Sequence, residues 1–166
     1  MEAYSSFAEV YDIFQDNVPY EEWCSYVTGL LREQGVERGL VLDLGCGSGI
    51  LSIAALVLGA ERASAVDIDP KAVDVAYENA TLNGIGKDRY TVQAGDVLTD
   101  RALAAELAQE RYQLVLANIV ADVIIPLAPQ VPGLLAEGGV FLCSGILDSR
   151  AHETLSDLVC RLLLEK

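Results

Sequence analysis

The stretch Leu40-Val41-Leu42-Asp43-Leu44-Gly45-Cys46-Gly47-Ser48-Gly49-Ile50 decides the fold of this chain. It begins with a short apolar run, 40–44, which is typical of a buried strand. Glycines at alternate positions follow, and glycine lets a backbone turn sharply and approach a ligand closely. The next residues, 50–58, have helical periodicity and are followed by Gly59. The stretch therefore predicts a strand, a glycine-rich turn and a helix in direct succession.

Strands and helices alternate along the rest of the chain. Further buried strands are expected at 63–66, 90–93, 113–117 and 140–144, and helices at 71–83, 101–110, 123–135 and 149–164. Because Pro126 and Pro129 interrupt 123–135, that helix is expected to begin late or to bend, and Gly138-Gly139 predicts a turn. Such alternation is typical of βαβ units in a parallel sheet that is covered on both faces. The predicted fold is therefore α/β, with a doubly wound parallel sheet.

The length of 166 residues fits a single domain. Aromatic side chains at helical spacing predict two helices within residues 1–35, the second beginning near Pro19 and ending at Gly35. We expect a helical cap at 1–38, a cofactor-binding core at 39–148 and a C-terminal helix at 149–166.

Charge and composition exclude several classes of function. The net charge is −14, with only 11 lysines and arginines, so the chain is not expected to bind nucleic acid, whereas a basic protein or a small amine would be attracted. No apolar run is long enough to cross a bilayer, and the first residues do not resemble a secretory signal, so we expect a cytoplasmic protein. The cysteines are scattered and there is 1 histidine, so no metal site is expected.

Three of the expected strands have an aspartate near their carboxyl end, either inside the strand or shortly after it. Asp43, Asp67 and Asp96 would all lie at the carboxyl edge of the sheet, where α/β proteins bind ligands. Asp67 has the spacing of a residue that accepts ribose hydroxyls. Asp43 beside the glycine loop would repel the pyrophosphate of a nicotinamide cofactor, and Ile50 stands where that fingerprint requires glycine or alanine. S-adenosylmethionine carries an ammonium and a sulfonium and no phosphate, so it fits these charges better.

Four motifs in order make the family resemblance specific. Residues 41–51 resemble the first motif of class I S-adenosylmethionine-dependent methyltransferases, and 65–70, Ala-Val-Asp-Ile-Asp-Pro, resemble the second. Residues 116–120, Leu-Ala-Asn-Ile-Val, resemble the fourth motif, and 144–147, Ser-Gly-Ile-Leu, resemble the end of the fifth strand. Together they resemble most closely the bacterial lysine methyltransferases that modify protein eleven of the large ribosomal subunit. The resemblance implies a Rossmann-like fold.

The resemblance also implies a role for each matching position. Asp43, Gly45, Cys46 and Gly47 would face the methionine part of the cofactor, and Asp67 would hold the ribose. Ile68 would pack on the adenine, Asp96 with Val97 would read the adenine amino group, and Asn118 would lie beside the methyl group. Tyr11 would cover the cofactor, as a separate resemblance of residues 4–14 to the cap helix of stand-alone class I enzymes implies. Asn118 is the candidate catalytic residue, because methyl transfer depends on positioning and an amide oxygen can orient an amine.

The chain also departs from that family. The N-terminal recognition domain is not expected here; residues 4–14 instead resemble the cap helix of stand-alone class I enzymes, and the last two strands of the usual sheet are expected to be lacking. The apolar strand 140–143 would then form an edge, which predicts a homodimer through this edge unless helix 149–164 covers it. The expected function is methyl transfer from S-adenosylmethionine, with S-adenosylhomocysteine as product, to an amine nitrogen of a protein or small molecule. The alternative is a cofactor-binding module or a catalytically incomplete fragment.

Overall fold

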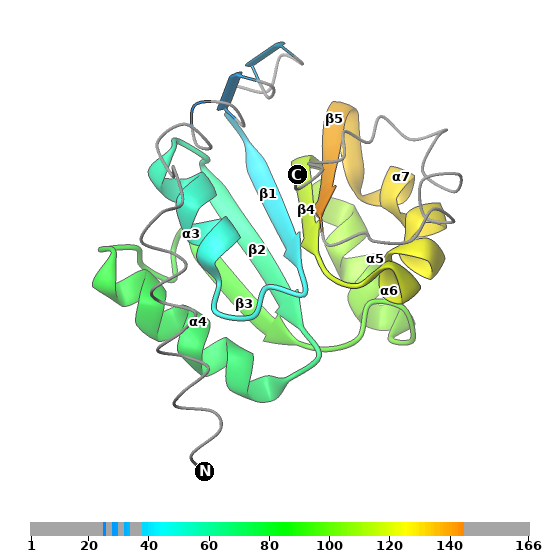
Figure 1. Cartoon of the computed structure of the whole chain (residues 1–166), viewed down its shortest axis with the longest axis horizontal. Coiled ribbons are helices and arrows are strands. Elements are labelled where there is room, and N and C mark those ends of the chain that lie inside the picture. The colour runs from blue at the N-terminus through cyan, green and yellow to red at the C-terminus, as the bar shows by residue number, and fades with distance from the viewer. Residues whose placement is uncertain (1–24, 26–27, 30–31, 34–37, 145–166) are drawn as a thin grey trace.

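The computed structural model describes residues 25, 28–29, 32–33 and 38–144 (Figure 1). The two N-terminal helices expected within 1–35, including Tyr11, fall largely or wholly outside the described residues, as does the expected helix 149–164.

Five parallel strands form one sheet in the order β3-β2-β1-β4-β5 (Figure 1). The strands are β1 (Leu40–Leu44), β2 (Arg62–Asp67), β3 (Tyr90–Ala94), β4 (Tyr112–Asn118) and β5 (Leu135–Ser144). The helices are α3 (Ile50–Val57), α4 (Pro70–Leu82), α5 (Arg101–Glu110), α6 (Ala121–Leu127) and α7 (Val131–Leu134), with a 3₁₀ turn η1 (Ala128–Gln130). The predicted doubly wound parallel sheet is confirmed. The strand order reverses direction at β1, which has β2 on one side and β4 on the other, and this is where such sheets bind ligands.

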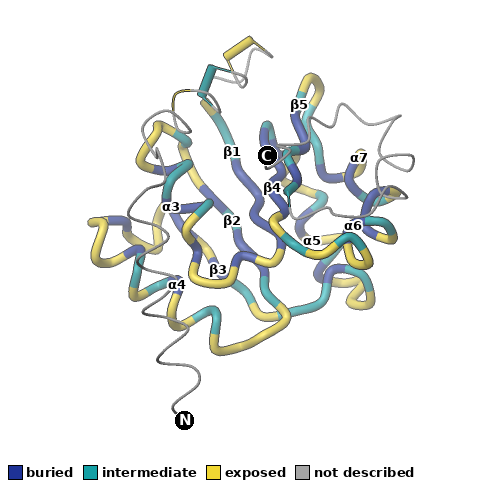
Figure 2. The backbone as a smooth tube through the Cα atoms, in the orientation of Figure 1, coloured by how far each residue is buried: buried dark blue, intermediate teal, exposed yellow. Residues whose placement is uncertain are grey.

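Two hydrophobic layers hold helices on opposite faces of the sheet, because successive strand residues point to opposite sides. Val41 faces α3 and α4, where it belongs to a cluster with Ile53 and Ala76. Leu42 faces the other way, in a cluster with Leu107 and Ile124. Figure 2 shows the strands as the buried centre of the molecule and the connecting segments at their ends as largely exposed. Among the described residues, both faces of the central strand are therefore covered, so a ligand would approach it at an end.

The helix expected at 123–135 is interrupted near Pro126 and Pro129, as a bend there predicts, but it is divided into three short pieces and begins early, at Ala121, and not late. The structure has α6 from Ala121, then η1, then α7, which ends at Leu134. Prolines cause the breaks: Pro126 lies inside α6, and Pro129 and Pro132 are the second residues of η1 and α7. A proline lacks the N–H of the helical ladder but fits the first turn, so each one favours a new short helix.

The expected turn at Gly138-Gly139 is instead a bulge inside a longer strand, since β5 begins at Leu135. The offset between paired residues of β4 and β5 grows from 23 positions, Tyr112 with Leu135, to 26 positions, Leu114 with Val140. Gly138 has a φ of +73°, and a Cβ on Gly139 would lie 2.8 Å from the carbonyl oxygen of Tyr112. Only glycine fits that approach, so the glycine pair sets the register of the rest of β5.

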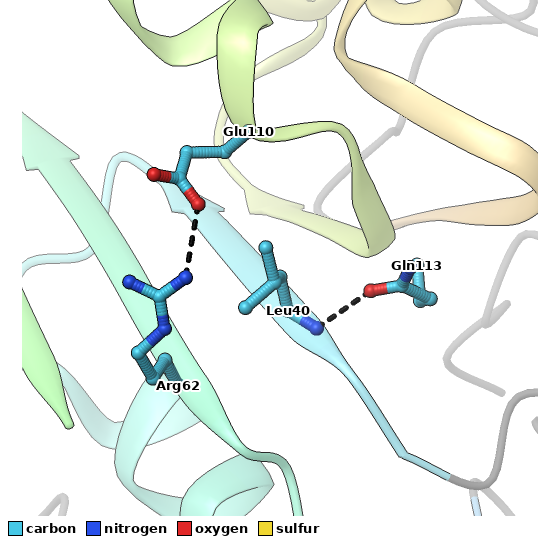
Figure 3. A network of polar contacts seen from close by, with 4 residues as sticks. All are labelled: Leu40, Arg62, Glu110 and Gln113. Carbon is cyan, nitrogen blue, oxygen red and sulfur yellow. Dashed lines mark hydrogen bonds and ion pairs between the residues drawn. The ribbon is translucent and has the colours of Figure 1, made fainter.

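Two polar contacts tie together the amino ends of the strands (Figure 3). The Arg62 guanidinium lies 3.1 Å from a carboxylate oxygen of Glu110, and the backbone N–H of Leu40 donates to the side-chain oxygen of Gln113 over 2.6 Å. Because both ionic side chains are about half exposed, the ion pair contributes less than about 1 kcal/mol. These contacts lie at the opposite edge of the sheet from the glycine loop.

None of the helices in the described ranges is long and apolar enough to cross a membrane.

Candidate functional site

The glycine loop between β1 and α3 follows the central strand at the point where the strand order reverses. Gly45, Gly47 and Gly49 have φ values of +72°, +51° and +79°, in the left-handed region that favours glycine. A Cβ on Gly45 would collide with the side chain of Ile119, and one on Gly49 would lie 2.6 Å from the hydroxyl of Tyr90. A Cβ on Gly47 would meet none of the described residues within 4 Å. Side chains at Gly45 and Gly49 would therefore collide with their neighbours, whereas the exposed Gly47 leaves room among the described residues for a ligand to approach.

Asp67 joins this loop to the end of β2. Its Oδ2 accepts a hydrogen bond from the backbone N–H of Gly47 over 2.7 Å, and its Oδ1 accepts one from the backbone N–H of Asp69 over 2.9 Å. Each carboxylate oxygen keeps a further lone pair, so Asp67 can still accept hydroxyl groups. Next to it, Ile68 is 74% exposed and offers an apolar surface on which a flat ring can pack. The arrangement suits a ribose with an attached base.

Asp43 lies beneath the loop, with only 1% of its surface exposed. Its Oδ2 accepts from Ser52 twice, from the hydroxyl over 2.6 Å and from the backbone N–H over 3.2 Å. Its Oδ1 is buried and has no hydrogen-bond partner among the described residues. Burial raises the pKa of Asp43 to about 6, against the opposing effect of the Ser52 hydrogen bonds, and the charge of Asp67 raises it further.

The Asp43 carboxylate determines whether the loop favours a positively or a negatively charged ligand. A cation close to the loop would favour the ionised form of Asp43, whereas a phosphate would oppose it. Because Asp43 is enclosed, we expect it to act on a ligand through its charge. Ser52 was not identified from the sequence, although a serine within the otherwise apolar helix 50–57 was a visible signal.

Cys46 contributes its backbone to the loop. Its N–H and that of Gly45 both donate to the carbonyl oxygen of Val66, over 3.2 and 2.8 Å, and so fasten the loop to β2. The thiol is buried, and burial raises its pKa to about 12, with the charges of Asp43 and Asp67 adding to the effect. The thiol is therefore protonated at neutral pH and is a poor nucleophile.

Asp96 and Val97 follow β3 at the same edge. Asp96 is half-buried, and its carboxylate accepts from the backbone N–H of Leu98 over 3.0 Å and from the hydroxyl of Thr99 over 2.8 Å. These bonds fix the carboxylate and leave lone pairs free for an amino group. The side chain of Val97 is buried in the core on the α5 side of the sheet.

Asn118 ends β4, beside the glycine loop. The pairing of Leu44 with Ala117 brings Gly45 and Asn118 to neighbouring positions on the edge. The Asn118 side chain is exposed, and its Oδ1 accepts a hydrogen bond from the hydroxyl of Ser144 over 2.9 Å. Ser144 lies directly opposite Asn118 at the end of β5 and was not identified as a site residue from the sequence.

The structure thus brings all but one of the candidate residues to one edge of the sheet. They are Asp43, Gly45, Cys46, Gly47, Asp67, Ile68, Asp96, Val97 and Asn118, whereas Tyr11 lies outside the described residues. Within the described ranges, no group of three or more potential ligand side chains could hold a metal ion.

Comparison with known proteins gives one consistent family. The family model described as ribosomal protein L11 methyltransferase (PrmA) matches residues 28–163. The ribosomal protein L11 methyltransferase of Agathobacter rectalis is 43% identical over 121 residues, which is 73% of this chain and 38% of that protein. The Pseudomonas aeruginosa protein of the same name is 48% identical over 113 residues, 68% of this chain and 35% of that protein.

A solved structure agrees with these relatives. The ribosomal protein L11 methylase of Lactobacillus delbrueckii subsp. bulgaricus is 36% identical, with a TM-score of 0.62, over 71% of this chain and 58% of that one. Compared with the two curated relatives, this chain spans little more than a third of their length.

Proposed function

Because the chain belongs to the ribosomal protein L11 methyltransferase family, we propose that it binds S-adenosylmethionine and transfers the methyl group to an amine nitrogen of a protein. The observation that carries the proposal is the family match together with the contact from the Gly47 N–H to Asp67, which closes a glycine loop at the reversal of the strand order. The acceptor we propose is ribosomal protein L11, after which the relatives are named.

The residues at the carboxyl edge fit the parts of this cofactor. Asp67 would accept the ribose hydroxyls, Ile68 would cover the adenine, and Asp96 would accept from its amino group. Asp43, enclosed beneath the loop with one oxygen that has no hydrogen-bond partner among the described residues, would supply negative charge close to the ammonium and sulfonium. When bound, S-adenosylmethionine supplies an electrophilic methyl group, whose bond to sulfur breaks as the new bond to nitrogen forms.

Asn118 has the position to orient the acceptor amine. The remaining lone pair of its Oδ1 can accept an N–H of the amine, so that the nitrogen lone pair points toward the methyl carbon. The net charge of −14 on the whole chain favours association with a basic protein. A lysine side chain has a pKa of about 10.4 in water, so it must lose a proton before it can attack.

Cofactor binding is tested by calorimetry of the purified chain with S-adenosylmethionine, S-adenosylhomocysteine and NAD. We expect the first two to bind and NAD to bind more weakly or not at all. Tighter binding of NAD would reverse the assignment.

The catalytic role is tested by incubating the chain with purified L11 and S-adenosylmethionine and measuring added methyl groups by mass spectrometry. Asn118→Ala should abolish transfer and leave the affinity for S-adenosylhomocysteine nearly unchanged, because the side chain acts on the acceptor. Asn83→Ala, a change at the C-terminal end of α4, is the matched control and should transfer normally. Normal turnover by Asn118→Ala, with a large loss of cofactor affinity, would contradict the role.

A second candidate function is a cofactor-binding module that does not transfer methyl groups by itself. The observation that favours it is the division of the site, in which Asp43, Asp67 and Asp96 are assigned to the cofactor and Asn118 alone is assigned to the acceptor. Tight binding of S-adenosylhomocysteine without transfer to L11 or to small amines would support this function over the first.

We also propose that two copies of the chain associate through β5. Within the described residues this strand pairs with β4 alone, and its segment 140–143 is apolar. An open strand edge offers unpaired backbone groups to a second chain, and antiparallel pairing would give a two-fold dimer.

A further inference from the structure

We propose that Ser144 is a positioning residue that fixes the orientation of the Asn118 side-chain amide; this inference rests on the proposed role of Asn118 in methyl transfer. The Ser144 hydroxyl donates to Asn118 Oδ1 over 2.9 Å. The two residues face each other across the last pair of the β4–β5 ladder, at the edge that carries the glycine loop. Asn118 is exposed, so few other contacts restrain its side chain.

The amide needs such a restraint because its terminal torsion has broad, two-fold preferences. In one orientation the oxygen faces the acceptor amine, accepts an N–H and leaves the nitrogen lone pair free to attack. In the flipped orientation the amide N–H₂ faces the amine and competes for that lone pair. As a donor to Oδ1, the Ser144 hydroxyl stabilises the first orientation, whereas in the flipped orientation it could act only as an acceptor from the amide N–H₂. The second lone pair of Oδ1 then remains for the amine.

The bulge in β5 is what brings Ser144 to this position. With the offset of 23 positions that holds between Tyr112 and Leu135, the residue opposite Asn118 would be Phe141. The shift to 26 positions at Gly138-Gly139 puts the serine there and turns Phe141 into the core. The glycine pair, far from the site along the strand, therefore determines which side chain can reach the amide.

The test compares Ser144→Thr with Ser144→Val, which have nearly the same shape and differ in the hydroxyl; Ser144→Ala is a third variant. The first measurement is the NMR order parameter of the Asn118 side-chain amide in ¹⁵N-labelled protein, assigned by its loss in Asn118→Asp. We expect a rigid amide in the parent and in Ser144→Thr, and values falling toward about 0.6 or below in the valine and alanine variants. Equal order parameters in the threonine and valine variants would overturn the proposal.

The second measurement is steady-state methylation of L11. The valine and alanine variants should lose about three- to tenfold in kcat, the scale of one hydrogen bond, with KM for S-adenosylmethionine nearly unchanged and with threonine restoring the rate. Ser64→Ala, within β2 and away from the carboxyl ends of the strands, should have the same kcat and KM as the parent. A rise in KM for S-adenosylmethionine without loss of kcat would overturn the positioning role. A parent that binds S-adenosylhomocysteine but transfers no methyl group would count against the proposed function, and the order parameters would still decide the contact.

Discussion

Replacing Asp43 with asparagine should stabilise the fold at neutral pH and weaken cofactor binding. The parent carboxylate is 1% exposed and has one oxygen without a partner among the described residues, so its ionised form is poorly solvated in the folded state. Its pKa is about 6 in the folded protein, compared with 3.8 for an ordinary aspartate. The folded chain therefore holds a proton between these values that the unfolded chain has lost. It follows that stability falls as pH rises from about 3.8 through 6.

The magnitude follows from the two pKa values. At pH 8 the penalty for ionising Asp43 in the folded state approaches about 3 kcal/mol, and at pH 5 it is about half of that. The asparagine of the Asp43→Asn variant cannot ionise, and the Ser52 hydrogen bonds to Oδ2 can still be made to an amide oxygen. The stability of Asp43→Asn relative to the parent should thus increase by about 1 kcal/mol between pH 5 and pH 8.

Urea denaturation at intervals between pH 5 and pH 8 measures this difference and avoids the isoelectric region near pH 4.2. Asp74→Asn, the same substitution on the exposed surface of α4, is the matched control. If the difference between Asp43→Asn and the parent did not change with pH, or fell with pH, the buried-carboxylate reasoning would be refuted. Calorimetry on the same variant at pH 7.5 should show weaker S-adenosylmethionine binding.

Other contacts lead to three further predictions. Asp67→Ala should weaken S-adenosylhomocysteine binding by about 1.5–3 kcal/mol in calorimetry, since it removes a charged hydrogen-bond acceptor, and unchanged affinity would disprove the ribose role. Tyr90→Phe should leave the free energy of unfolding unchanged or raise it by up to about 1 kcal/mol, because the buried Tyr90 hydroxyl has no hydrogen-bond partner among the described residues. A clear fall in the melting temperature would mean that the hydroxyl is bonded. Light scattering over a concentration series should show a dimer, and a chain that stays monomeric at high concentration would exclude association through β5.

The sequence predicted the sheet and most of the site because both depend on local patterns. The apolar run 40–44 and the glycines after it do not have the pattern of a helix. The parallel topology alone brings Asp67, Asp96 and Asn118 to the same end of the sheet. Parallel strands joined by helices must bring their carboxyl ends to one edge, so any polar residue that follows a strand is a candidate for the site.

The parts that the sequence did not predict depend on contacts between distant segments. Ser52 and Ser144 act through partners that are 9 and 26 positions away, and only the assembled fold brings these pairs together. Gly138-Gly139 looks like a turn locally, but the parallel neighbour β4 continues alongside and converts it into a bulge. Pro132, which was not considered in predicting helix 123–135, contributes to the breaks that a periodic apolar pattern does not reveal.

The central place of β1 in the sheet has a consequence for the order of folding. Val41 pairs with Ala63, 22 residues along the chain, on one side and with Leu114, 73 residues along the chain, on the other. The short loop closure costs less entropy, so we expect β1, β2 and β3 with α3 and α4 to assemble before β4 docks. Until that late step, Gly45 lacks Ile119 as its neighbour and Asn118 is far from the glycine loop. A ligand that contacts both the glycine loop and Asn118 would therefore bind after the main barrier to folding. Such a ligand would slow unfolding without speeding folding.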